Sequence, residues 1–296
     1  MGTKMLSVAL AAIALGAVTV APASAAEGNP IIEITSVARG TCLQIEVDPA
    51  PDRPRVVLAD CTGAPDQRWE QIPVGDGRVI LRNTTMRDCV EANFSLTNFW
   101  CDEKSDYQHA ELVADRDGTV RIKYGDDYVD SSSNDVNVYA EPMVADSDHQ
   151  RWRVRQTGTT APPADTAGQV VRLEAVALDY GCLGVDGSST PKSLPCADVA
   201  GQRFQRVELA GGGTALRSLA NDKCLNAEAG AEAVVDALSE CDIADTGQHW
   251  RFDRTAVGTY RVWSGERLLT PGDDHAWAVP EYPPFIPVQT WHVTAA

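Results

Sequence analysis

A repeated Gln-x-aromatic tripeptide constrains the fold of this chain more than any other feature. Six copies occur, and the second has lost its aromatic residue; they start at Gln67, Gln108, Gln150, Gln202, Gln248 and Gln289. The starting positions step by 41 and 42 residues in the first half of the chain and by 46 and 41 in the second. A period of this length indicates a fold assembled from copies of one supersecondary unit.

Short strand-like runs follow the internal copies and are separated by glycine turns. Asp76-Gly77 stands between Gln67–Ile72 and Val79–Leu81, and Asp117-Gly118 takes the same place in the next repeat. Such turns between short alternating runs are typical of β-hairpins. Helical periodicity is missing from the sequence, so the pattern predicts a closed, all-β architecture.

The tripeptide itself suggests a structural role. Residues i and i+2 of a strand share a face, so we expect the Gln and the aromatic residue to point into the same core. A buried Gln amide has to satisfy its donors and its acceptor. This requirement favours a clamp on neighbouring backbone over a catalytic role.

The chain is predicted to divide into a leader and two domains. Lys4, the apolar run Met5–Val20 and the small residues Ala23–Ala25 resemble a secretory signal peptide over residues 1–25. A membrane anchor is the alternative, but the run is short for a span and no second apolar stretch follows it. Residues 157–168 are rich in Pro, Thr and Gly and predict a linker. We therefore expect a secreted, extracellular protein without membrane insertion, with domains at 26–156 and 169–296.

The eight cysteines fall into four local pairs, which are Cys42/Cys61, Cys89/Cys101, Cys182/Cys196 and Cys224/Cys241. In an exported protein such pairs favour disulfides. A metal site would require close ligand pairs such as Cys-x-x-Cys, and the sequence has none. Four disulfides and no metal site are therefore predicted.

Charge and motifs narrow the classes of function. The net charge is −17, which disfavours nucleic acid and anionic membranes as partners. The sequence lacks His-Glu-x-x-His, Gly-x-Ser-x-Gly and phosphate-binding glycine loops. With the cysteines paired, no nucleophilic thiol remains. We expect a protein without catalytic residues and without a cofactor.

Cysteines and tripeptides occur in a fixed order within three of the repeats. Cys-Leu, a strand ending in Cys and then Gln-x-aromatic run from Cys42 to Trp69, from Cys182 to Phe204 and from Cys224 to Trp250. This order resembles the ricin-type lectin family, and the resemblance covers nearly all of the chain after the leader. It implies two tandem β-trefoil domains, each of three Gln-x-Trp repeats forming a barrel capped by hairpins. It also implies disulfides in the first and second repeats of each domain and one potential sugar site in each repeat.

The resemblance implies a role for particular residues in the sugar sites. In the family an acid lies two residues after the first Cys, a ring two residues before the second, and a polar residue just before the Gln. A carboxylate accepts hydrogen bonds from sugar hydroxyls, and an aromatic face stacks on the C–H surface of the ring. The third repeat carries the fullest set, which is Asp130, Asn137, Tyr139, His149 and Gln150. The second repeat carries a weaker set, Glu91 and Phe99, with Tyr107 before its Gln.

The other four repeats lack the acid, the ring or both. The residues at these positions are Gln44 and Ala59, Gly184 and Leu194, Asn226 and Ser239, and Thr270 and Trp277. Asp186, Asp273 and Asp274 lie nearby, but aspartates of this kind are typical turn formers.

Two hypotheses about function follow. The first is a lectin-like protein that binds a glycan or polysaccharide, with Asp130 as acceptor and Tyr139 as stacking platform. The second is a trefoil scaffold that has lost sugar binding and contacts a protein partner, as an inhibitor or adhesion factor. The missing acids of the second domain favour the second hypothesis. A turn acid and an exposed strand tyrosine would also account for Asp130 and Tyr139 without a sugar site.

Overall fold

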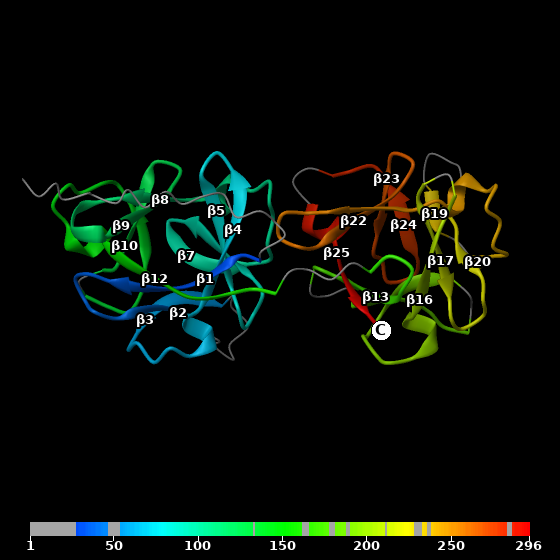
Figure 1. Cartoon of the computed structure of the whole chain (residues 1–296), viewed down its shortest axis with the longest axis horizontal. Coiled ribbons are helices and arrows are strands. Elements are labelled where there is room, and N and C mark those ends of the chain that lie inside the picture. Colours follow the sequence, from blue (N-terminus) through cyan, green and yellow to red (C-terminus); the bar gives the residue numbers. More distant parts are fainter. Residues whose placement is uncertain are drawn as a thin grey trace, which may run out of the picture.

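The computed structural model describes residues 28–46, 54–132, 134–161, 166–177, 181–187, 190–210, 212–227, 233–235, 238–282 and 286–296. Over these residues the chain forms short strands, which make two separate sheets, and 3-10 turns between them (Figure 1). In this part of the chain, no helix has the length and apolar character needed to cross a membrane. The predicted leader, residues 1–25, and residues 162–165 of the predicted linker lie outside the described residues.

The first sheet contains three successive sets of four strands within the described residues. They are β1 (Pro30–Ser36), β2 (Cys42–Glu46), β3 (Arg55–Ala59) and β4 (Trp69–Gly75); β5 (Arg78–Asn83), β6 (Cys89–Asn93), β7 (Ser95–Phe99) and β8 (Ala110–Ala114); and β9 (Val120–Tyr124), β10 (Asp127–Asp130), β11 (Tyr139–Glu141) and β12 (Trp152–Thr159).

The outer strands of the three sets close a barrel. Pairing runs from β1 to β4, β5, β8, β9 and β12 and returns to β1, always antiparallel. The inner strands form the hairpins β2–β3, β6–β7 and β10–β11. These hairpins meet through β7, which pairs with β3 and with β11. A six-stranded barrel capped by three hairpins is a β-trefoil.

The second sheet repeats this plan. Its strands are β13 (Val170–Ala175), β14 (Cys182–Val185), β15 (Pro191–Leu194), β16 (Phe204–Glu208), β17 (Thr214–Ser218), β18 (Cys224–Leu225), β19 (Ala233–Val235), β20 (Leu238–Ser239), β21 (Arg251–Arg254), β22 (Tyr260–Ser264), β23 (Arg267–Thr270), β24 (Ala276–Val279) and β25 (Trp291–Ala295).

The ring of the second unit runs through β13, β16, β17, β21, β22 and β25, and a bridge between Thr214 and Trp250 links β17 to the start of β21. The predicted all-β fold of two tandem β-trefoils is therefore confirmed. The exact domain limits stay a prediction. Strand β12 pairs with β1 as far as Thr159, three residues into the predicted linker.

The six glutamines of the repeat confirm the predicted clamp. Each glutamine ends a 3-10 turn. These turns are η1 (Pro65–Gln67), η2 (Asp106–Gln108), η4 (Asp148–Gln150), η5 (Ala200–Gln202), η6 (Thr246–Gln248) and η7 (Ile286–Gln289). The remaining turn of the described residues, η3 (Arg116–Gly118), does not end in a glutamine. The Gln67 amide is typical: Nε2 donates to the Asp60 carbonyl at 2.7 Å, and Oε1 accepts from the Thr62 N–H at 2.8 Å. The other five glutamines bond the preceding segment in the same way.

The expectation that Gln and aromatic residue share a strand face is wrong. The Gln stands in the 3-10 turn, where its amide can reach the loop behind it. The aromatic residue begins or immediately precedes the next strand. Both side chains are buried, but through two different elements.

The aromatic residues of the repeat form the centre of both barrels. Trp69, Trp152, Trp250 and Trp291 are completely buried. Each indole N–H donates to a backbone carbonyl of the hairpin at 2.9–3.0 Å. The hydrogen bond offsets the desolvation of each indole N–H, so the large apolar ring can stabilise the core.

The second repeat fills its part of the core with a tyrosine instead of a tryptophan. Trp69 lies opposite Asn83, and Trp152 lies opposite Ser36, whereas Ala110 lies opposite Tyr124. Tyr124 is buried in the same core cluster as the tryptophans. Its ring therefore fills the space that the missing indole leaves.

The four disulfides confirm the predicted pairing. Cys42 joins Cys61, Cys89 joins Cys101, Cys182 joins Cys196, and Cys224 joins Cys241. Each bridge lies within one repeat and ties its hairpin to the segment before the Gln turn.

Candidate functional site

Hairpin β10–β11 of the third repeat brings the predicted acid and ring together. Asp130 ends β10, Tyr139 begins β11, and the two residues are directly opposite in the antiparallel register. Opposed residues of this kind project from the same face with Cβ atoms about 5 Å apart. Asn137 precedes Tyr139 by two residues, and all three side chains are half-buried. A carboxylate and an aromatic ring therefore stand side by side at the surface.

Asp135 holds the ring of Tyr139 in place, and it was not predicted from the sequence. One carboxylate oxygen of Asp135 accepts the Asn137 N–H at 2.9 Å, and the other accepts the Tyr139 hydroxyl at 3.3 Å. These hydrogen bonds, the backbone one foremost, keep the pKa of Asp135 below its usual range. The signal in the sequence was an aspartate two residues before an asparagine, which is the spacing of an Asx turn.

Arg39 fixes the same loop from the first repeat. It lies in the turn between β1 and β2, and its Nη1 donates to the carbonyls of Ser132 and Asp135 at 2.8 and 2.7 Å. One guanidinium nitrogen thus joins Ser132 and Asp135 to the first repeat. No local pattern could reveal this contact, because more than 90 residues separate its partners.

The carboxylate of Asp130 keeps one oxygen available. Its Oδ1 accepts the Ser132 N–H at 3.0 Å, while among the described residues no partner contacts Oδ2. His149 lies close by: its Nδ1 is 3.3 Å from the hydroxyl of Ser131, the residue after Asp130. The arrangement offers a hydrogen-bond acceptor, an imidazole and a ring at one shallow surface.

Gln150 does not belong to this surface. Its side chain is fully buried, its Nε2 donates to the Pro142 carbonyl at 2.9 Å, and its Oε1 accepts the Val144 N–H at 2.8 Å. Its amide is therefore used within the fold, as in the other repeats.

The second repeat places its acid and ring differently. In hairpin β6–β7, Glu91 lies opposite Thr97, and Phe99 lies opposite Cys89. The ring is thus one diagonal step away from the acid rather than directly across from it. Phe99 also packs on Trp100, with 4.1 Å between the ring centroids, and Trp100 was not predicted from the sequence.

The remaining repeats use the equivalent positions for internal contacts. A Cβ atom on Gly184 would lie 2.9 Å from the Leu194 side chain and 2.8 Å from that of Gln202, so both side chains pack on the backbone at this position. Gln44 accepts a hydrogen bond from Gln67 at 2.8 Å. Asn226 donates to Asp245 at 2.7 Å and to Ser239 at 3.1 Å.

The sixth repeat has a ring without an acid. Thr270 lies opposite Trp277, whose ring centroid is 4.1 Å from that of His275. Among the described residues, no group of three or more His, Cys, Asp or Glu side chains is placed to hold a metal ion.

Comparisons with known proteins give structural neighbours only. No protein-family model matches the sequence, and no curated protein matches it. A designed threefold-symmetric protein, ThreeFoil, is 19% identical; the match covers 43% of this chain and 99% of that chain, with a TM-score of 0.39. A ricin B-like lectin from Macrolepiota procera in complex with lactose is 14% identical over 44% of this chain and 98% of that chain, with a TM-score of 0.37. The hemolytic lectin CEL-III is 18% identical over 90% and 64%, with a TM-score of 0.36. The trefoil assignment itself follows from the strand pairing described above.

Proposed function

We propose that this chain is a secreted carbohydrate-binding protein of lectin type, with its principal site on hairpin β10–β11. The observation that carries the proposal is the direct opposition of Asp130, with an available carboxylate oxygen, and Tyr139, whose ring is held by Asp135. Glu91 and Phe99 form a second, weaker site. The leader-like N-terminus and the four disulfides support an extracellular location.

Binding would combine two kinds of contact. The free oxygen of Asp130 accepts hydrogen bonds from adjacent sugar hydroxyls, and Tyr139 stacks on the C–H face of the same sugar. Asn137 and His149 add polar contacts at the edge. Because Arg39 and Asp135 hold the loop in advance, little ordering entropy is lost on binding. The site binds a glycan and performs no reaction on it.

A shallow site of this kind binds weakly on its own. Useful affinity for a polysaccharide then comes from several sites on one chain or from many chains on one surface. With only two of six repeats retaining an acid and a ring, we expect a Kd in the range of weak single-site lectins and strong dependence on glycan density.

A glycan array followed by calorimetry tests the proposal. Wild type is compared with Asp130→Asn, which keeps the size of the side chain and removes its charge. Loss of a charge-assisted hydrogen bond predicts a 10- to 100-fold weaker Kd, on the order of 1.5–3 kcal/mol. Asp126→Asn is the matched control, because Asp126 is an exposed acid on the adjacent β9–β10 turn.

Two results would overturn the proposal. One is an array without signal for wild type, which would leave the protein-partner hypothesis as the better account of the trefoil. The other is equal binding by wild type and Asp130→Asn, which would move the site away from hairpin β10–β11.

A further inference from the structure

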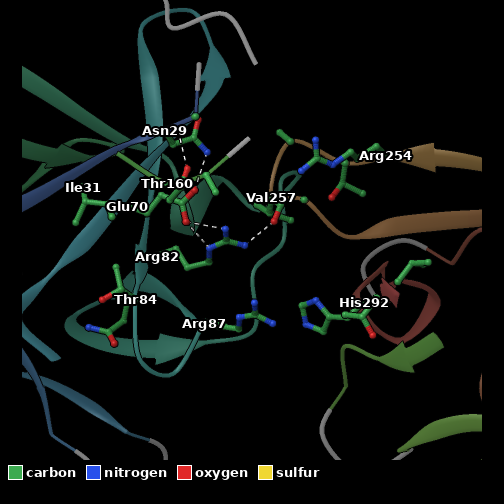
Figure 2. A pocket seen from close by; sticks show the side chains of 18 residues that line it. Asn29, Ile31, Glu70, Arg82, Thr84, Arg87, Thr160, Arg254, Val257 and His292 are labelled. Carbon is green, nitrogen blue, oxygen red and sulfur yellow. Dashed lines mark hydrogen bonds and ion pairs between the residues drawn. The ribbon is translucent and has the colours of Figure 1, made fainter. Parts of the chain in front are cut away.

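A cleft of about 680 Å³ lies between the two trefoils, and neither hairpin site contributes to it. Its first wall comes from β4, β5, the β5–β6 turn, the start of β1 with residues 28–29, and residues 160–161. Its second wall comes from the β21–β22 segment and β25 (Figure 2). The volume falls within the ordinary range for small-molecule sites. Because each trefoil supplies one wall, the cleft exists only when the two units are docked.

Specific contacts hold the two walls together. Val257, from the β21–β22 loop, is buried against Ile72, Ile80 and the Cys89–Cys101 disulfide of the first unit. Arg82 donates to the Val257 carbonyl at 2.6 Å. At the same boundary, Glu103 accepts the Ala256 N–H at 2.6 Å and Lys104 pairs with Glu281 at 2.5 Å. These contacts hold the two walls of the cleft in position.

The charges lining the cleft are unusual for a chain with a net charge of −17. Arg82 is neutralised by Glu70, which it contacts at 2.6 and 2.9 Å, and Asn29 bonds the other oxygen of Glu70 at 2.8 Å. Arg87 and Arg254 are exposed, and in the described part of the chain neither guanidinium has an ion pair or hydrogen bond. One uncompensated arginine thus stands on each wall.

His292 lies on the second wall and faces Arg87 (Figure 2). Burial, reinforced by Arg87, lowers the pKa of His292 despite the opposing effect of Glu174. Glu174 and Asp88 line a smaller adjoining cavity rather than the cleft itself. Among the described residues, the lining of the cleft therefore holds two arginines without a partner, the His292 imidazole and one carboxylate, Glu70, which is already paired; Arg87 and His292 also line the adjoining cavity.

We propose that this cleft binds an acidic saccharide, with sulfate or carboxylate groups engaged by Arg87 on one wall and Arg254 on the other. A guanidinium group presents paired donors that match the geometry of an oxyanion. Ile31 and Val293, which are half-buried in the lining of the cleft, supply apolar contact for the sugar rings. The saccharide class rests on the proposed function, whereas recognition of an oxyanion rests on the two arginines alone.

Calorimetry on the intact chain tests this inference with three probes. They are a disaccharide carrying one carboxylate and one sulfate, the same disaccharide desulfated and carboxyl-reduced, and inorganic sulfate. We expect the acidic disaccharide to bind and the neutral one to fail. Competition by inorganic sulfate at similar concentration would show that the cleft recognises the oxyanion alone. That result would support the roles of the two arginines and overturn the assignment of a saccharide ligand.

Arg87→Gln and Arg254→Gln should each weaken binding of the acidic disaccharide by about tenfold or more, the size of one charged hydrogen bond. Arg153→Gln is the matched control, since Arg153 is exposed on β12 and does not line the cleft. Equal weakening in all three variants would show diffuse charge attraction and overturn the site, as would absence of binding at low salt. The array signal assigned to Asp130 is a separate readout that both cleft variants should retain, so failure of either proposal can be told from failure of the other.

Discussion

Hairpins β6–β7 and β10–β11 occupy equivalent places in the second and third repeats, yet they are held by different means. The second repeat has the Cys89–Cys101 disulfide, an offset acid and ring, and Ala110 in the core below. The third repeat has no disulfide, and its acid and ring are directly opposed above a buried Trp152.

This comparison of the two hairpins distinguishes the contacts that stabilise the trefoil from those that position the acid and the ring. The fold needs a filled core and a hairpin tied to the barrel, and either a covalent bridge or a hydrogen-bonded loop can supply the tie. The third repeat places its acid and its ring directly opposite each other, with the tyrosine held by Asp135, whereas the second repeat places them one diagonal step apart.

The largest effect is expected from Trp152→Ala. This substitution leaves an indole-sized cavity in the barrel and should cost about 3–5 kcal/mol of unfolding free energy. The second repeat tolerates alanine at this position because Tyr124 fills the space. Denaturant unfolding of the intact chain, followed by tryptophan fluorescence and circular dichroism, measures the loss.

A double-mutant cycle in the second repeat is the matched control. Ala110→Trp alone should overpack the core and cost about 1–3 kcal/mol, because Tyr124 already occupies the site. Adding Tyr124→Asn restores the pairing seen at Trp69 and Asn83, so the double variant should recover much of this loss. Additive effects of the two changes would contradict the compensation inferred from the register.

The next effect concerns the disulfide that distinguishes the second hairpin. Replacing Cys89 and Cys101 together by alanine opens a loop of 12-residue separation. The loss should be about 3 kcal/mol by the chain-entropy estimate. Val257 packs on this bridge, so we also expect the docking of the two trefoils to weaken. Small-angle scattering of the double variant, compared with Cys224 and Cys241 replaced together, separates local destabilisation from undocking.

Whether a contact in this structure could be predicted from the sequence depends on how far apart its two residues lie in the chain. The Gln clamp and the local disulfides connect residues within one repeat, so their spacing was visible in the chain. The offset of Phe99 from Glu91 was not visible, because register depends on loop length within each hairpin. Asp135 carried a weak local signal, whereas Arg39 and Val257 carried none, since their partners lie in other repeats.

A smaller effect is expected from Arg39→Gln. The variant loses the guanidinium hydrogen bonds to the loop after Asp130. The loop is then less ordered before binding, so it loses more conformational entropy when a glycan binds. We expect about three- to tenfold weaker glycan binding and a change in unfolding free energy below about 1 kcal/mol, because the contact is exposed. Calorimetry with the best array glycan measures the first quantity and thermal unfolding the second. A large loss of stability with unchanged binding would show that Arg39 serves the fold rather than the site.

The smallest effect tests the register argument by gain of function. Thr97 lies opposite Glu91, in the place that Tyr139 holds opposite Asp130, and it is half-buried on the same hairpin face. Thr97→Tyr should bring a ring directly beside Glu91 and strengthen the second site. Because no residue equivalent to Asp135 would hold the new hydroxyl, we expect only a two- to threefold gain in apparent affinity for a dense glycan surface, about 0.5 kcal/mol. The measurement is made in an Asp130→Asn background, where we expect the third-repeat site to be weakened about 10- to 100-fold, and Thr97→Leu controls for added apolar area. A gain with leucine equal to that with tyrosine would mean that surface hydrophobicity, and not the opposition of acid and ring, sets glycan binding on these hairpins.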